Sequence, residues 1–240
     1  TTSPTTVPFV VYRWANDQPN TVATEAFRGD PFATMAPNKN CGWTMEVRGA
    51  GVNTEIMMST SASNVVSILK TTDGSTFTAN EILVPGVPNS FCRLGICFGA
   101  GNTFWAKAWQ GDGGQLRLVQ YDLAAKTGTV LKTYTNVSST MTTVAYNDTL
   151  KFLGGIARDD QKNMMLYNVA DLESGPVLLD QEVFPTYNPS IEANGALDFG
   201  GNTYLFGLNE NNGVMAMLIN PDYVPSVKPF SILSTTATGN

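Results

Sequence analysis

The sequence predicts an all-β fold. We expect one β-propeller domain over residues 1–240, with five blades of four antiparallel strands and a fifth blade whose inner strands are not accounted for. Two observations lead to this prediction: a turn motif recurs about every fifty residues, and the strands around it lack strict polar–apolar alternation. Only 14% of the residues are charged and there are 22 glycines and 13 prolines, which is typical of many short strands and turns.

The recurring motif is Asn or Asp followed by Thr. Its four copies are Asn53-Thr54, Asn102-Thr103, Asp148-Thr149 and Asn202-Thr203. Each copy lies between two strand-like segments, and Asn and Gly accept the backbone of a tight hairpin turn, so each copy predicts a hairpin of strands A and B. A strongly apolar strand C, a polar turn and a strand D follow each time. The predicted repeats cover about 41–84, 91–135, 141–184 and 194–233.

The C strands distinguish a propeller from a two-layer sandwich. Residues 164–167 and 214–219 are apolar at successive positions, so both faces of these strands should be covered. Stacked four-stranded blades meet this requirement. A sandwich remains the alternative architecture.

The first repeat is preceded by a half-repeat. Residues 6–27 match a C–D hairpin without its A–B partner. Ring closure would need a further A–B hairpin, which lies beyond Asn240, comes from another chain, or is replaced by an unusual last sector. An unpaired edge of this hairpin would be a template for strand addition, including self-association.

Three segments carry a family resemblance. The opening Val10–Asn16, the Gly29-Asp30-Pro31 after its hairpin and the turn Thr71–Gly74 resemble secreted bacterial propeller-like proteins of unknown function. This resemblance implies a propeller and export to the extracellular space or cell surface, and it brings no catalytic motif. A chain that begins at Thr1 without methionine agrees with a cleaved export signal.

Composition excludes several functions. The net charge of −6 argues against nucleic-acid binding, and no apolar run reaches the ~18 residues of a membrane span. The absence of histidine removes Ser-His-Asp and Cys-His catalysis, and three cysteines without CxxC spacing predict no zinc site. We therefore expect no metal and no cofactor. Cys41, Cys92 and Cys97 are interpreted as small buried apolar residues.

Acid–base chemistry would then depend on carboxylates, as in glycosidases and aspartic proteases. The A strands should line the central channel, and Glu46 and Asp198 are their acidic residues. These two are the candidate catalytic pair. The candidate ligand-binding residues at the same level are Arg93, Arg48, Tyr146 and Trp43.

Three functions remain open. The leading hypothesis is a non-enzymatic extracellular binding or adhesion module with a glycan, glycoprotein or other surface ligand. The alternative is an extracellular hydrolase that uses Glu46 and Asp198 on a glycan or protein at acid-leaning pH. The second alternative is a structural subunit of a surface assembly.

Overall fold

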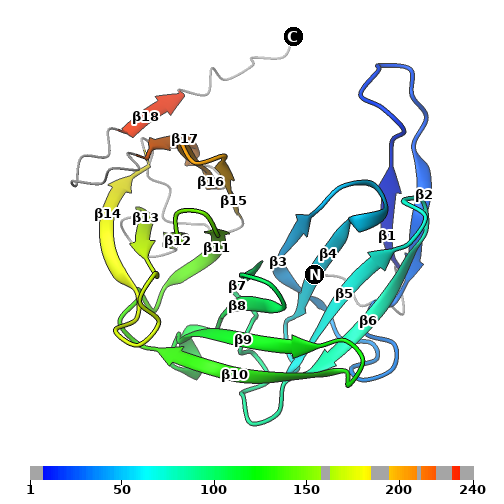
Figure 1. Cartoon of the computed structure of the whole chain (residues 1–240), viewed down its shortest axis with the longest axis horizontal. Coiled ribbons are helices and arrows are strands. Elements are labelled where there is room, and N and C mark those ends of the chain that lie inside the picture. Colours follow the sequence, from blue (N-terminus) through cyan, green and yellow to red (C-terminus); the bar gives the residue numbers. More distant parts are fainter. Residues whose placement is uncertain (1–7, 158–162, 185–194, 210–211, 220–228, 233–240) are drawn as a thin grey trace.

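The computed structural model describes residues 8–157, 163–184, 195–209, 212–219 and 229–232, and these form strands, turns and two short 3-10 helices. The chain begins with the hairpin β1 (Phe9–Arg13) and β2 (Thr24–Gly29). Four four-stranded antiparallel units follow and are arranged around a centre (Figure 1). The predicted all-β, propeller-type architecture is confirmed, whereas the count of five blades stays a prediction.

Each unit is one blade, with its strands in sequence order from the centre outwards (Figure 1). Blade 1 contains β3 (Cys41–Arg48), β4 (Glu55–Thr60), β5 (Val65–Thr71) and β6 (Phe77–Leu83). Blade 2 contains β7 (Gly95–Phe98), β8 (Thr103–Lys107), β9 (Leu116–Asp122) and β10 (Thr127–Tyr134). Blade 3 contains β11 (Met141–Asn147), β12 (Phe152–Ala157), β13 (Asn163–Asn168) and β14 (Val177–Val183). Blade 4 contains β15 (Gly195–Gly200), β16 (Tyr204–Asn209), β17 (Gly213–Leu218) and β18 (Pro229–Ile232).

The recurring Asn/Asp-Thr motif marks the turn between the two inner strands of every blade. In blade 1 this turn contains the 3-10 helix η1 (Gly51–Asn53). Gly101 and Gly201 provide the left-handed backbone in blades 2 and 4, with φ of 56° and 62°. Blade 3 has no glycine in this turn, and Lys151, which follows the motif, takes a φ of 57°. Each of the four turns therefore contains a left-handed residue, although its position and the length of the turn differ between blades.

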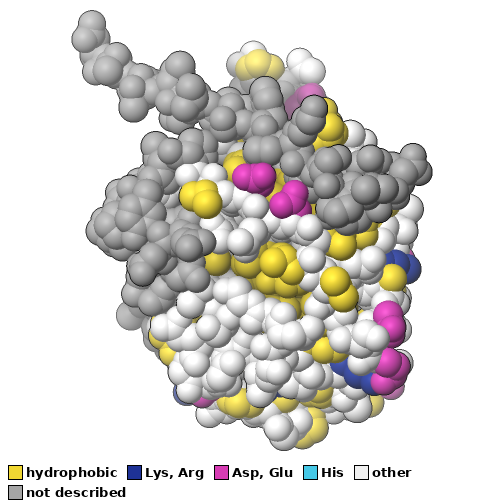
Figure 2. Space-filling model, turned by 90° about the vertical axis from the view of Figure 1, so that its left-hand side faces the viewer, with side chains coloured by type: hydrophobic (Ala, Val, Ile, Leu, Met, Phe, Trp, Pro, Cys, Tyr) yellow, Lys and Arg dark blue, Asp and Glu magenta, His cyan; other side chains and the backbone are white. Residues whose placement is uncertain are grey.

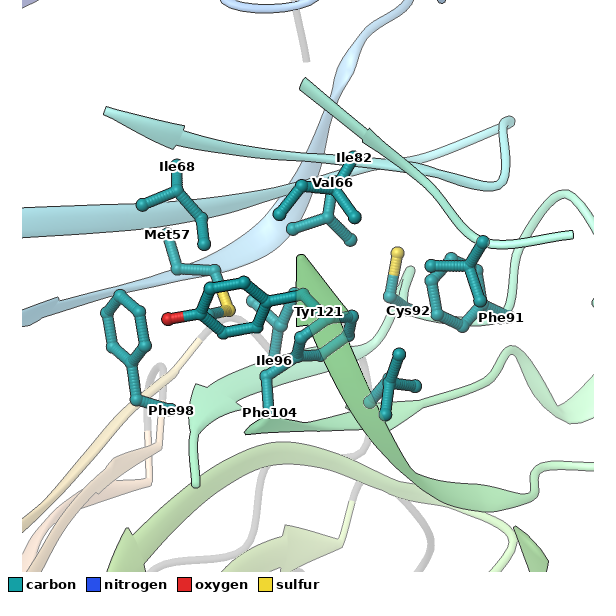
Figure 3. Packing of buried hydrophobic residues seen from close by; sticks show 13 residues of the cluster. Met57, Val66, Ile68, Ile82, Phe91, Cys92, Ile96, Phe98, Phe104 and Tyr121 are labelled. Carbon is teal, nitrogen blue, oxygen red and sulfur yellow. The ribbon is translucent and has the colours of Figure 1, made fainter. Parts of the chain in front are cut away.

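The core lies between the blades. Alternate side chains of one strand pack against different neighbours: on β8, Phe104 and Ala106 contact blade 1, whereas Trp105 contacts blade 3. Similar clusters join blade 3 to blade 4 and the hairpin β1–β2 to blade 1. Figure 3 shows the cluster between blades 1 and 2, where Met57 and Ile68 of blade 1 lie opposite Tyr121 and Phe104 of blade 2. Both faces of the sheets of blades 2 and 3 are covered, as the C-strand pattern predicts, whereas β3 of blade 1 and β16 of blade 4 each expose apolar side chains on one face.

The inner strands lie next to one another in the order β3, β7, β11, β15. Gly95 at the start of β7 permits the close approach to β11, because a Cβ atom there would lie 2.3 Å from the carbonyl oxygen of Thr142. At the outer rim, blades 1 and 2 are joined by a single parallel pairing of Leu83 with Thr127. The blades are thus connected both at the centre and at the periphery.

The cysteines follow the interpretation made from sequence in two cases. Cys92 and Cys97 are buried, Cys41 is partly buried, and all three are free thiols. On the face shown in Figure 2, the described residues carry few charged side chains, and hydrophobic ones gather near the middle. The outermost strand of blade 3 exposes Val177, Leu178 and Val183.

Truncation of an aromatic residue buried between two blades should destabilise the protein far more than truncation of an exposed aromatic residue on blade 4. Phe104 on β8 is fully buried between blades 1 and 2, whereas Phe206 on β16 is exposed. We expect F104A to lower the free energy of unfolding by about 3–5 kcal/mol and F206A by less than about 1 kcal/mol. Urea unfolding of both variants measures the difference, and equal losses would contradict the described packing.

Candidate functional site

The candidate site lies where the inner strands of blades 1, 2 and 4 face the centre. Glu46 on β3 is partly buried, and its carboxylate accepts a hydrogen bond from the backbone N–H of Phe98 on β7. Thr44, two residues earlier on the same strand, accepts a hydrogen bond from the N–H of Ile96 at 3.1 Å. The backbone N–H groups along this edge of β7 are therefore hydrogen-bonded to side chains of β3 rather than to the backbone of β3.

The pKa of the Glu46 carboxyl group is higher than usual. Its pKa is raised to about 7 as the net result of four effects: burial and the negative charge of Asp198 raise it, while the Phe98 N–H and the charge of Arg48 lower it. Burial is the dominant cause. Near neutral pH, a large share of Glu46 is therefore protonated and able to donate a proton.

Asp198 is the second predicted catalytic carboxylate. It lies on β15, is exposed, and accepts a hydrogen bond from the N–H of Phe199 at 2.8 Å. Its electrostatic effect on Glu46 shows that the fold brings these two acidic residues from blades 1 and 4 within interaction range. The site thus combines a carboxyl group of raised pKa with an exposed carboxylate.

Cys97 and Tyr146 complete the inner-strand environment. Burial raises the pKa of the Cys97 thiol well above its usual range, and the charge of Glu46 adds to this effect. Tyr146 donates its hydroxyl hydrogen to Asp148 at 3.1 Å and places its ring 6.0 Å from that of Trp105. Sequence reasoning placed Tyr146 at this level and interpreted Cys97 as a buried apolar residue, which its complete burial confirms.

Arg48 is occupied within the protein. Its guanidinium forms an ion pair with Glu55 at 2.6 Å, donates to the Tyr121 hydroxyl at 2.7 Å and to the Gly101 carbonyl at 3.0 Å, and lies over the Phe98 ring. Lys70 also pairs with Glu55 at 2.6 Å. Arg48 thereby connects β3 to the inner turn of blade 2, and most of its donor groups are used.

The remaining predicted ligand-binding residues are placed differently. Arg93 precedes β7, at the strand end opposite Phe98, and its guanidinium stacks over the Trp109 ring at 4.4 Å. Trp43 belongs to β3, and its side chain is outside the described part of the structure. The structure therefore brings together Glu46, Asp198 and Arg48, and places Arg93 at the other end of its inner strand.

No cluster of three His, Cys, Asp or Glu side chains suited to a metal ion occurs in the described ranges. No helix among the described residues is long and apolar enough to cross a membrane.

Comparison with known proteins shows a structural likeness only. No protein family and no curated protein matches the sequence. A protein from Lactobacillus plantarum has a TM-score of 0.59 at 11% identity, over 93% of this chain and 64% of that one. Two proteins described as proposed 6-phosphogluconolactonases, from Bacteroides uniformis and Bacteroides fragilis, have TM-scores of 0.55 and 0.57 at 11% and 10% identity. Alignment covers 92% and 94% of this chain, and 63% and 65% of those chains.

These similarities support the propeller-type fold. At this level of identity they carry no residue roles. The chain spans less than two thirds of the length of these three structures.

The raised pKa of Glu46 predicts a pH-dependent stability. The folded pKa of about 7 exceeds the ordinary glutamate value of 4.5, so the folded state binds more protons than the unfolded state between these pH values. The stability that proton binding by Glu46 adds to the folded state is fully present below pH 4.5 and is lost as the pH rises through 7. E46Q should remove this dependence and be more stable than the wild type above pH 7, by roughly 2 kcal/mol.

Chemical denaturation between pH 4 and 9 measures this effect. Asp17 is exposed in the turn between β1 and β2, and D17N serves as the matched control. A stability difference between E46Q and the wild type that does not change with pH would contradict the raised pKa of Glu46.

Proposed function

We propose that this protein is a hydrolase that uses Glu46 and Asp198 as an acid–base pair. The observation that carries the proposal is that a Glu46 carboxyl group of raised pKa lies within electrostatic range of the exposed Asp198 carboxylate. Two acidic residues whose environments differ in this way can serve as general acid and general base. The lack of histidine leaves carboxylates as the main acid–base groups.

The roles follow from the environments. Protonated Glu46 would donate its proton to the leaving-group oxygen as the scissile bond breaks. Asp198 would accept a proton from the attacking water, or attack the substrate itself. The Phe98 N–H then stabilises the Glu46 carboxylate formed when its proton leaves.

The polar environment favours a neutral sugar substrate. Two of the structurally similar proteins are described as proposed 6-phosphogluconolactonases, which suggests sugar derivatives as the first compounds to test. A phosphate group would need cationic partners, but Arg48 is already paired with Glu55 and lies beside two carboxyl groups. A glycan or an unphosphorylated sugar lactone therefore fits this site better than a sugar phosphate, and a peptide is the remaining substrate to compare.

A binding module is the second candidate. The hydrogen bond from Phe98 to Glu46 connects blades 1 and 2 and gives this residue a structural role without catalysis. In that case the propeller would bind a glycan or glycoprotein ligand at its inner surface or rim and would release it unchanged.

We also propose that the protein acts outside the cell and that β1–β2 is the outer half of a fifth blade. The low lysine content and the Thr- and Asn-rich composition support export. The hairpin supports the fifth blade because β2 contacts β6 at the outer rim, where the outer strand of a preceding blade would lie. Fractionation of the producing cells tests the location, and recovery of the protein in the cytoplasm would contradict it.

Turnover assays distinguish the two functions. We expect hydrolysis of a neutral glycan or sugar lactone, with kcat/KM falling about tenfold per pH unit above pH 7 as Glu46 loses its proton. E46Q and D198N should each lower kcat by about 10²-fold or more, and D17N should leave it unchanged. Ligand binding without turnover, retained in both variants, would support the binding module and contradict the hydrolase.

A further inference from the structure

An apolar groove of about 730 Å³ runs between the N-terminal hairpin and blade 1. One wall is β1, where every residue from Phe9 to Trp14 contributes. The other includes Met45 and Val47 of β3 and Ile56 of β4. Successive side chains of a strand point to opposite faces, so a groove lined by six consecutive residues follows the strand's edge.

That edge of β1 has no partner strand in the described part of the chain. β1 pairs only with β2, whereas the corresponding third strand of every blade is paired on both sides: β5, β9, β13 and β17. The backbone groups on one side of β1 are therefore open for hydrogen bonding. Unpaired edges of this kind bind additional strands.

The wall formed by β3 is apolar and unusually exposed. Met45 and Val47 are 59% and 54% exposed, whereas Ile96 and Phe98, which face the preceding blade from β7, are 1% and 5% exposed. The hairpin β1–β2 contacts the outer strands of blade 1, where Phe9 and Val11 pack against the cluster around Ile56. No described strand occupies the place beside β3 that an inner strand fills in the other blades.

Blade 4 presents a second apolar wall at the other end of the row of blades (Figure 1). Tyr204, Phe206 and Leu208 project from the same face of β16 and are 38–45% exposed. The corresponding residues of the other blades are buried against the next blade, as Trp105 is on β8. Both ends of the incomplete ring therefore expose the type of surface that blades use to pack against each other.

We propose that the open sector beside β1 binds a β-hairpin from a partner polypeptide. The outer strand of that hairpin pairs antiparallel with β1, as β4 pairs with β5 in blade 1. Its inner strand covers Met45 and Val47. Because the walls on both sides are apolar, the hairpin must carry apolar side chains on both of its faces. This inference does not depend on hydrolase activity.

The chain itself supplies a suitable probe. The inner hairpin of blade 3, residues 141–157, is apolar on both faces: Val144 and Leu153 face blade 2, whereas Phe152 and Ile156 face blade 4. A synthetic, fluorescently labelled peptide of residues 141–157 is titrated with the protein, and polarisation reports binding. Hydrogen exchange of the β1 amides reports strand pairing.

We expect saturable binding and slower exchange of the amides of Phe9–Arg13. M45K should weaken binding by about tenfold or more, because it places a charge against an apolar partner. V22K is the matched control, because Val22 is exposed in the loop between β1 and β2 and does not line the groove. V22K should bind the peptide as the wild type does.

Four results would overturn the proposal. They are no saturable binding, equal binding of a control peptide carrying V144K and L153K, binding without protection of β1, and a stable dimer in light scattering whose interface protects β1. The last result would show that a second copy occupies the groove instead of a partner hairpin. Circular dichroism of M45K confirms that the variant is folded, as expected for a substitution at an exposed position.

Discussion

The structure depends on apolar sheets that are covered on both faces. Adjacent residues of one strand, such as Phe104 and Trp105 on β8, are buried against different blades. Blades 2 and 3 therefore each cover two neighbours, and the apolar clusters lie between blades rather than within one of them. Burial of apolar surface stabilises by about 25 cal/mol per Å², so the contacts between blades supply most of the stabilising energy.

This packing determines what happens at the centre. When the blades stack, their innermost strands lie side by side without forming a backbone ladder between β3 and β7. The free N–H groups of Ile96 and Phe98 then need acceptors, and Thr44 and Glu46 provide them. The same arrangement removes Glu46 from water and exposes it to the charge of Asp198, which produces its raised pKa. A requirement of packing thus creates a chemically unusual group.

The packing also explains the low sequence similarity to structures with the same architecture. Identities of 10–12% accompany TM-scores of 0.50–0.59. A blade needs apolar side chains on both faces and short turns, and many residue combinations meet these conditions. The turn of blade 3, where Lys151 adopts the backbone conformation that glycine adopts elsewhere, shows this tolerance within one chain. Fold similarity of this kind leaves the chemistry to the individual residues on the inner surface.

The sequence by itself determined the repeating strand pattern, because turn residues and successive apolar positions are local signals. Asn53-Thr54 and its three counterparts lie at the inner turns, and Glu46, Tyr146 and Asp198 lie on inner strands. Only the tertiary structure decided which of these residues interact. The pairing of Arg48 with Glu55, the effect of Asp198 on Glu46 and the position of Cys97 depend on how separate blades approach. Such distances are set by packing between blades, which no local sequence pattern encodes.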